Sequence, residues 1–385
     1  MPPLRTLLTL PVCLTLLALT SAASTTPAPP AVDTALTRLV TQGKVPAAAL
    51  LAAEGSASRF AHAEAPTTTD PAAAGSSADA IRHTDATLPA DAIRHTDATL
   101  PADAIRRTDH FRAGSITKSF VATVVLQLAA EHRLSLSDSV EDHLPGLVHG
   151  SGNDGRALTL RTLLTHTSGL ADFTADTAGT VSLTPLQAVR IAIAHPPAER
   201  GRFEYSNTNY VLLGMVVEQV TGRSYAAEAE RRIITPLHLT GTSFPGARHS
   251  LPDPHGRSYT ADGSDVTDLD PRVAGAAGEL VTTLADLNRF YAALLRGNLL
   301  PPRQLREMLD TGTAHGLYGM GLYSEKLPCG TTVWGHNGRI TGSYVRTAAT
   351  LDARRVLTFR VNTDAIADPD LEPALLAAEF CPRTP

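Results

Sequence analysis

The distribution of apolar residues most constrains the fold of this chain, because strand-like runs lie near both ends and helical patterns lie between them. Val45 to Ala52 is a short, continuous apolar run, which is typical of a buried strand. Gly319 to Thr363 is typical of strands and turns, with Asp352-Ala353-Arg354 between two strand-like runs. We therefore expect a sheet that is assembled from both ends of the chain, with a helical insertion between them.

Apolar spacing and capping residues predict helices at six places. These segments are 33–40, 115–131, 184–194, 210–220, 284–295 and 371–380. Asp33 is expected to cap the first helix, and Thr283 with Asp286 three residues later is expected to form a capping box at the fifth. Residues 245–271 form a polar loop stretch.

The N-terminus has the features of an export signal. Arg5 supplies a positive flank, Leu7 to Leu19 is apolar, and small residues allow cleavage after Ala23. The alternative is a membrane span, but the run is shorter than the roughly 20 residues that a bilayer requires. We expect residues 1–23 to be removed, and the protein to be secreted without a stable membrane anchor.

Composition and charge narrow the function classes. The chain has 385 residues, 43% of them hydrophobic and 18% charged, which fits a globular protein. Its formal net charge is −5 and it has no Lys/Arg cluster, so a nucleic-acid partner is not expected. The cysteines form no CxxC pair, and we expect neither a metal nor a cofactor.

After the expected signal, the chain divides into a short linker and one large domain. Residues 24–32 are the expected linker and 33–385 the expected domain. Within it, 33–135 and 276–385 are predicted to form an α/β part, and 136–275 a mainly helical part.

A twelve-residue segment is duplicated in the N-terminal third. Residues 79–90 recur without change at 91–102, and a truncated third copy follows. The period matches no solenoid unit, so we interpret 79–108 as a lengthened surface loop. His83 and His95 lack the accompanying ligands of a metal site.

The cysteines favour one disulfide. Cys13 would leave with the signal, so that Cys329 and Cys381 would remain. An even count in an oxidising compartment favours a bond between them, and the alternative is two separate buried thiols.

Ser115 and Lys118 form the first chemical signal, because residues three apart at a helix start share one face. A lysine whose pKa is lowered by desolvation can remove the serine proton. Lys44, Lys118 and Lys326 are the only lysines, and an arginine at position 118 could not act as a base. The alternative is an exposed helical lysine that follows an N-cap serine.

Two further motifs lie downstream. Tyr205 could shuttle a proton and Asn207 could hold a substrate amide, although a turn tyrosine packed on the core is the alternative. The run Trp334 to Arg339 contains His336, Asn337 and Gly338. Its strand edge could bind a substrate backbone, and the alternative is a glycine-rich hairpin turn.

Taken together and in this order, the motifs resemble those of the serine β-lactamase and penicillin-binding protein superfamily. Within it the chain resembles the branch of Streptomyces-type D-alanyl-D-alanine carboxypeptidases, class C β-lactamases and related esterases, over about Asp33 to Cys381. The matching segments are Phe111 to Phe120, Leu163 to Leu170, Tyr205 to Tyr210 and Gly335 to Gly338.

The resemblance implies an α/β (α+β) fold with an antiparallel sheet flanked by helices and an inserted all-helical domain. It implies that Ser115 is acylated and that Lys118 and Tyr205 move protons. Asn207, His336, Asn337, Gly338 and Arg339 would bind substrate, with His336 where many members use lysine. The backbone amides of Ser115 and Arg339 would bind the oxyanion, and Cys329 and Cys381 match a disulfide of the Streptomyces enzymes.

One departure concerns substrate choice. Carboxypeptidase members hold the terminal carboxylate with an arginine on the strand before the cysteine, but residues 320–326 contain none. Arg339 is the candidate to supply that charge, since a guanidinium suits carboxylate binding.

The resemblance therefore predicts a monomeric serine hydrolase with an acyl-enzyme, acting on D-Ala-D-Ala peptides such as a peptidoglycan stem peptide and on β-lactam-like compounds. An esterase, a β-lactamase or a D-amino-acid amidase is the alternative among enzymes. A non-catalytic cell-wall-binding protein is the alternative of another class.

Overall fold

The computed structural model describes residues 31–65, 81–84 and 104–381. The predicted signal at 1–23 and most of the duplicated segment lie outside the described residues. None of the helices in the described part has the length and hydropathy of a membrane span.

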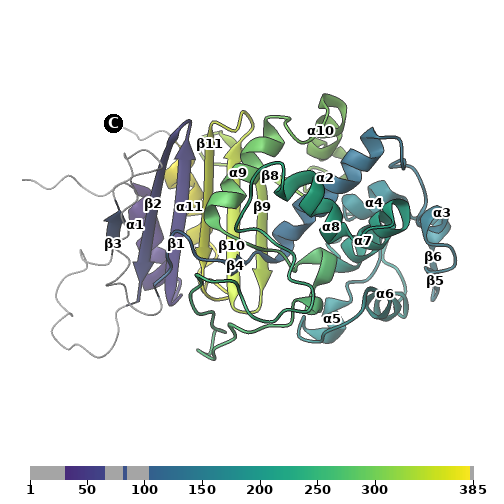
Figure 1. Cartoon of the computed structure of the whole chain (residues 1–385), viewed down its shortest axis with the longest axis horizontal. Helices are drawn as coiled ribbons and strands as arrows, with labels where there is room; N and C mark the ends of the chain where they lie inside the picture. The colour runs from purple at the N-terminus through teal and green to yellow at the C-terminus, as the bar shows by residue number, and fades with distance from the viewer. Residues whose placement is uncertain (1–30, 66–80, 85–103, 382–385) are drawn as a thin grey trace, which may run out of the picture.

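One antiparallel sheet of seven strands is built from both ends of the chain, as the apolar pattern predicts. Its order is β3-β2-β1-β11-β10-β9-β8, and the purple N-terminal strands lie beside the yellow C-terminal strands in Figure 1. The two ends meet where β1 pairs with β11. The strands are β1 (Ala47–Glu54), β2 (Ala57–Glu64), β3 (Ile81–Thr84), β8 (Tyr323–Lys326), β9 (Thr332–Ile340), β10 (Ser343–Thr350) and β11 (Arg355–Val361).

Helices cover both faces of this sheet. Successive residues of a strand point to opposite faces. Leu50 of β1 accordingly packs in the core beneath α1 and α11, and Leu51 packs in the larger core with α2 and α9. A strand that is buried on both faces needs no polar alternation, which explains the continuous apolar run.

The middle of the chain forms the helical half of the molecule, drawn in teal and green in Figure 1. The helices of the whole described chain are α1 (Ala31–Thr41), α2 (Thr117–Ala130), α3 (Val140–His143), α4 (Leu160–Leu164), α5 (Thr174–Thr177), α6 (Pro185–Ile193), α7 (Asn207–Thr221), α8 (Tyr225–Ala229), α9 (Leu284–Leu295), α10 (Pro302–Leu309) and α11 (Leu371–Phe380). A π-helix, η4 (Glu230–Ile234), and the 3-10 turns η2 (Gly114–Ile116), η3 (Gly155–Ala157), η5 (Pro271–Val273), η6 (Gly275–Ala277) and η7 (Gly312–Ala314) join them. Two small sheets pair β4 (Phe111–Arg112) with β7 (Val281–Thr282) and β5 (His149–Gly150) with β6 (Asn153–Asp154).

Three local predictions differ from the structure. Asp33 lies inside α1 and pairs with Arg59 of β2, so it is not an N-cap. Thr283 does cap α9, but the Asp286 carboxylate accepts from Gly241 N instead of completing the capping box. Four residues of the duplicated segment form the edge strand β3 against β2.

The predicted disulfide is confirmed. Cys329 follows β8, Cys381 follows α11, and their Cα atoms lie 5.8 Å apart. The bond ties the β8–β9 turn to the C-terminal helix.

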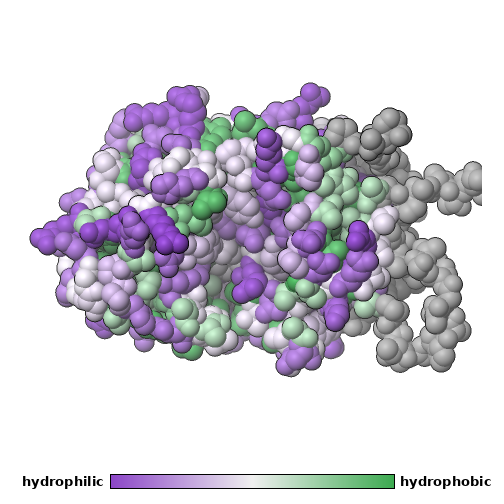
Figure 2. Space-filling view, turned by 180° about the vertical axis from the view of Figure 1, so that it is seen from behind, coloured by the Kyte–Doolittle hydropathy of each residue, from purple (hydrophilic) through white to green (hydrophobic). Residues whose placement is uncertain are grey.

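The surface is mainly polar. Figure 2 shows hydrophilic residues over most of one face, with apolar residues in small groups among them. The large apolar residues that are exposed in the described part are Val181, Leu186, Leu317 and Leu351. Apolar side chains are therefore concentrated in the two cores on either side of the sheet.

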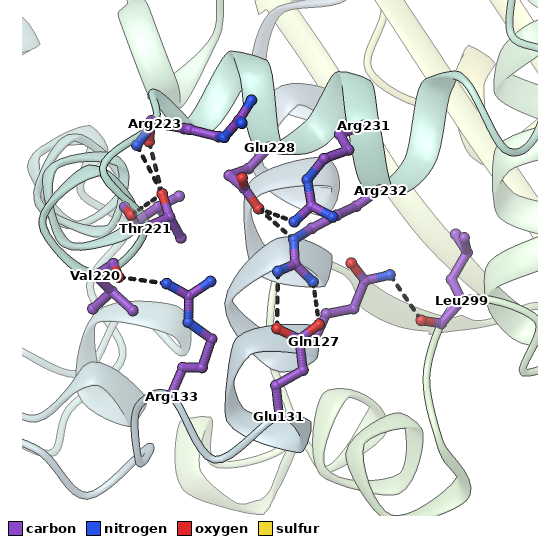
Figure 3. A network of polar contacts seen from close by, with 11 residues as sticks. Gln127, Glu131, Arg133, Val220, Thr221, Arg223, Glu228, Arg231, Arg232 and Leu299 are labelled. Atoms are coloured by element: carbon purple, nitrogen blue, oxygen red, sulfur yellow. Dashed lines mark hydrogen bonds and ion pairs between the residues drawn. The ribbon is translucent and has the colours of Figure 1, made fainter.

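A polar network anchors the C-terminal half of α2 (Figure 3). Arg232 of η4 donates two hydrogen bonds to the carboxylate of Glu131 at the end of α2, one of them 2.9 Å long. It also donates to the carboxylate of Glu228 of α8. The Glu228 carboxylate is buried and also accepts from Arg231 at 2.8 Å. Gln127 adds a bond to the carbonyl of Leu299 at 2.9 Å.

Removing Arg232 should destabilise the fold, because Glu228 and Glu131 would lose a largely buried partner. We expect Arg232→Met to lower the free energy of unfolding by about 3 kcal/mol, measured by urea denaturation. Arg303→Met, which removes an exposed pair with Glu307, is the control and should cost at most about 0.5 kcal/mol. Equal losses in the two variants would contradict the role of the network.

Candidate active site

Ser115 lies in a tight turn between β4 and α2 that depends on two glycines. Gly114 has φ +51°, and a Cβ there would lie 2.8 Å from the backbone nitrogen of Arg339. A Cβ on Gly338 would lie 1.8 Å from the carbonyl oxygen of Ala113. Only glycine fits at position 114 and at position 338. The turn before α2, which we call the serine helix, can therefore lie backbone against backbone with strand β9.

The Lys118 amine is fully buried and has three neighbours. Its Nζ lies 3.0 Å from Ser115 Oγ, 2.8 Å from Asn207 Oδ1 and 2.8 Å from the carbonyl oxygen of Ala277. The orientation of Asn207 is fixed, because its Nδ2 donates to the Asp172 carboxylate at 2.9 Å, which leaves Oδ1 toward the lysine.

This arrangement suits a neutral amine that acts as a base. Burial lowers the pKa of Lys118 to about 7, while the charge of Asp172 partly opposes the shift. The oxygens of Asn207 and Ala277 can only accept, so they take the two N–H groups of the neutral amine. The remaining lone pair then faces the hydroxyl of Ser115.

Tyr205 completes the group around the serine. Its phenol is hydrogen-bonded to Ser115, and burial raises its pKa, so it stays protonated at neutral pH. Its ring centroid lies 4.9 Å from Lys118 Nζ and 4.2 Å from the ring of buried His166. His166 Nδ1 accepts from Ser206 N at 3.2 Å and from Asn209 Nδ2 at 3.1 Å, which fixes the loop that carries Tyr205.

These groups open into a cavity of about 730 Å³, which we call the serine cavity. It is lined by Ser115, Asp172, Thr174, Ala178, Gly179, Tyr205, Asn207, Val273, Ala274, Ala277, Gly278, Asn337, Arg339, Ile340, Thr341 and Asp364. Strand β8 pairs with β9 only as far as Gly335, which lies opposite Tyr323. Beyond that point, on the side toward β8, the edge of β9 has no strand partner among the described residues.

The serine cavity contains charges of both signs. Asp172 and Asp364 are acidic, and Arg339 is exposed and has no ion pair with any residue that the structure describes. Asp172 Oδ1 also accepts from Thr174 N at 3.0 Å. Within the described part, no three His, Cys, Asp or Glu side chains gather as they do around a metal ion.

The predicted site residues divide into two groups. Ser115, Tyr205, Asn207, Asn337 and Arg339 line the serine cavity, and Lys118 lies directly beneath Ser115. His336 and Gly338 are buried and are not among the lining residues.

His336 cannot supply a positive charge here. Its Nε2 lies 2.8 Å from the hydroxyl of Tyr318. Burial lowers its pKa to about 3, although a bond to the carbonyl of Asn337 partly opposes the shift, and the nearby charges of Lys118 and Arg346 lower it further. The ring is therefore neutral, unlike the lysine that it was expected to replace.

Sequence reasoning missed Asp172 and the Ala277 carbonyl. Asp172 closely follows the marker Leu163 to Leu170, but nothing local indicates that it contacts Asn207. A backbone carbonyl carries no sequence signal.

A buried arginine near β8 does not replace the absent carboxylate-binding residue. Arg346 of β10 lies over the ring of Tyr323, 4.5 Å from its centroid. It is paired with Glu325 at 3.4 Å and Glu372 at 3.3 Å. Its charge is already neutralised, so Arg339 is the exposed cation of the serine cavity.

Comparison with known sequences connects the whole domain to one family. A family model described as Beta-lactamase matches residues 32–379. Putative penicillin-binding protein PbpX of Bacillus subtilis is 30% identical over 217 residues, which cover 55% of this chain and 53% of that protein. Penicillin-binding protein 4 of Amycolatopsis lactamdurans is 31% identical over 264 residues, which cover 61% of this chain and 68% of that protein. The chain thus spans about half the length of PbpX.

Solved structures share the fold. A D-stereospecific amidohydrolase from Streptomyces sp. superposes with a TM-score of 0.76 at 37% sequence identity. The match covers 92% of this chain and 99% of that chain.

The buried amine predicts a pH dependence for the reactivity of Ser115. If Lys118 is the base, labelling by a fluorophosphonate, a general serine reagent, should accelerate as pH rises through about 7, because only a neutral amine can accept the serine proton. Lys118→Met should slow labelling about a hundredfold or more and remove this pH dependence.

Lys326→Met is the matched control, since it removes an exposed lysine at the end of β8. Ser115 in this variant should be labelled at the same rate, and with the same pH dependence, as in the unmodified protein. An unchanged pH profile in Lys118→Met would contradict the assignment of the base.

Proposed function

The chain belongs to the beta-lactamase family, and from this we propose that it is a serine amidohydrolase that cleaves the amide bond following a D-amino acid through an acyl-enzyme on Ser115. The chain is a hydrolase of the beta-lactamase fold, and the proposal concerns its substrate and its residues. The observation that carries the proposal is the 3.0 Å contact between Ser115 Oγ and the buried amine of Lys118.

Acylation would begin when Ser115 Oγ attacks the carbonyl carbon of the substrate and Lys118 Nζ takes the hydroxyl proton. The tetrahedral oxyanion would be bound by the backbone amides of Ser115 and Arg339. The close packing of Gly114 on the Arg339 backbone supports this pairing. Collapse would break the C–N bond, and the proton would pass from the Lys118 ammonium through Tyr205 to the leaving nitrogen.

Deacylation would repeat these steps with water as the nucleophile. Lys118 would take a proton from water as its oxygen attacks the Ser115 ester. When the C–O bond breaks, the same proton would return to Ser115 Oγ, and the product would leave with a free carboxyl group.

Asp172 supports a substrate with a free α-ammonium. Both N–H groups of Asn207 Nδ2 have acceptors already, Asp172 Oδ2 at 2.9 Å and Thr174 Oγ1 at 3.2 Å. Beside Asn207 the serine cavity presents the Asp172 carboxylate, which favours a substrate with a cationic amine over an N-acylated one. The similarity to the Streptomyces D-stereospecific amidohydrolase supports the D-configuration.

The second candidate is a D-alanyl-D-alanine carboxypeptidase that binds penicillin. The observation that favours it is Arg339, an exposed cation with no partner among described residues, which suits a terminal carboxylate. Similarity to two penicillin-binding proteins also supports it. In that case Asn337 and Arg339 on the open edge of β9 would hold the substrate backbone.

We also propose that the protein acts outside the cell as a monomer. The apolar run at 7–19 and the disulfide between Cys329 and Cys381 support export, since disulfides persist in oxidising compartments.

An acyl-enzyme should be detectable by mass. A brief incubation with a D-phenylalanine ester or with a penicillin, stopped by acid before deacylation is complete, should add one acyl group to Ser115, located by peptide mapping. Ser115→Ala should acquire none. An adduct that forms equally in Ser115→Ala would refute Ser115 as the nucleophile.

Two variants separate the substrate classes. Asp172→Asn keeps an acceptor for Asn207 but loses the charge, so KM for D-phenylalaninamide should rise about tenfold, while that for its N-acetyl derivative should change little. Arg339→Gln should raise KM only for substrates that have a terminal carboxylate. If Arg339→Gln alone reduces turnover, and D-Ala-D-Ala peptides are the better substrates, the carboxypeptidase candidate is correct.

A further inference from the structure

A second cavity of about 540 Å³ lies on the other side of one wall of the serine cavity. The wall is the segment 273–279, and Ala274 lines both cavities. Apolar residues dominate the second cavity, among them Phe173, Leu183, Val211 and Met215. Its volume is in the range of small-molecule sites. We call it the Glu279 cavity.

Glu279 is the unusual residue in this apolar setting. The side chain is buried, with 5% of the residue exposed, and it lines the cavity. Its Oε1 accepts from the hydroxyl of Tyr225 at 2.5 Å. Burial raises the pKa of Glu279 to about 7; the hydrogen bond from Tyr225 partly opposes that shift, and no cation among the described residues does.

The charges around Glu279 leave it without a counter-ion. Arg272 is the basic residue in the lining, but its guanidinium is engaged by Asp270 at 2.6 and 3.0 Å. Glu218 of α7 also lines the cavity. Burial raises the pKa of Tyr225, and the two carboxylates raise it further. A carboxylate in apolar surroundings is costly unless a cation pairs with it.

We propose that the Glu279 cavity binds a small apolar molecule that carries an ammonium group. The ammonium would pair with the Glu279 carboxylate, and the apolar body would fill the space lined by Phe173, Leu183 and Met215. The site goes beyond the proposed hydrolysis, because Ser115 lines only the serine cavity.

A ligand in the Glu279 cavity should also affect Lys118, the proposed base. The wall that the ligand would touch includes Ala277, whose carbonyl accepts from Lys118 at 2.8 Å. Phe173 lines the Glu279 cavity and follows Asp172, which orients Asn207. Two of the three contacts of the Lys118 amine therefore depend on segments that the ligand would contact.

Calorimetric titration of the full chain tests the proposal, with 2-phenylethylamine as the probe and 2-phenylethanol as its uncharged counterpart. We expect the amine to bind and the alcohol to bind about tenfold more weakly or worse. Glu279→Gln keeps an acceptor for Tyr225 and should weaken binding of the amine about tenfold. Ala226→Leu should weaken binding of both probes, because the larger side chain fills the cavity. Thermal melting verifies that each variant is folded.

Asp172→Asn is the matched control, because the amine could also enter the serine cavity. Binding that survives Asp172→Asn but not Glu279→Gln supports the proposal. Binding lost only in Asp172→Asn, equal affinity for amine and alcohol, or no binding to the unmodified protein overturns it. None of these results depends on turnover, so a failure here is separate from a failure of the proposed hydrolysis.

The pH profile gives a further readout. The titratable or charged groups that line the cavity are Glu279, Glu218 of α7, Tyr225 of α8 and Arg272 of η5. Protonation of Glu279 below about 7 removes its charge, so the amine should bind more weakly at lower pH. The alcohol should show no such change. An amine affinity that does not fall on acidification contradicts pairing with Glu279.

Discussion

The geometry of the site depends on the amine of Lys118, which is buried away from bulk water. Three parts of the chain meet at Lys118 Nζ: the turn with Ser115, the first residue of α7 and the carbonyl of Ala277. Each fixes one direction of a tetrahedral nitrogen. Because two of these neighbours only accept hydrogen bonds, the direction of the lone pair follows from them. Asp172 acts through Asn207, since it decides which end of that amide faces the lysine.

The architecture explains how residues so distant in sequence become neighbours. The sheet unites both ends of the chain, and β9 lies against the serine turn where Gly338 meets Ala113 and Gly114 meets Arg339. The other end of α2 is joined to α8 and η4 by Arg232 (Figure 3). The serine helix is thus fixed at its start by backbone packing and at its end by ion pairs.

Periodicity and motifs predicted the sheet, the bounds of α11, the cysteine pair and the residues around Ser115. They could not predict what depends on tertiary distance. Asp286 has the spacing of a capping box, yet Gly241 offers its carboxylate a better placed donor. His336 stands in a motif that suggested substrate contact, but it lies behind the cavity lining and is bonded to Tyr318. Glu279 has no local pattern, and its isolation from cations appears only when Arg272 is seen to be engaged by Asp270.

The unpaired edge of β9 has a consequence for molecular recognition. Backbone groups along a strand repeat at about 3.3 Å per residue, so they align only with a chain that is itself stretched out. A coiled or tightly folded peptide would offer its polar atoms at the wrong intervals. If this edge of β9 holds the substrate backbone as proposed, it would select substrates by their backbone conformation as well as by their side chains.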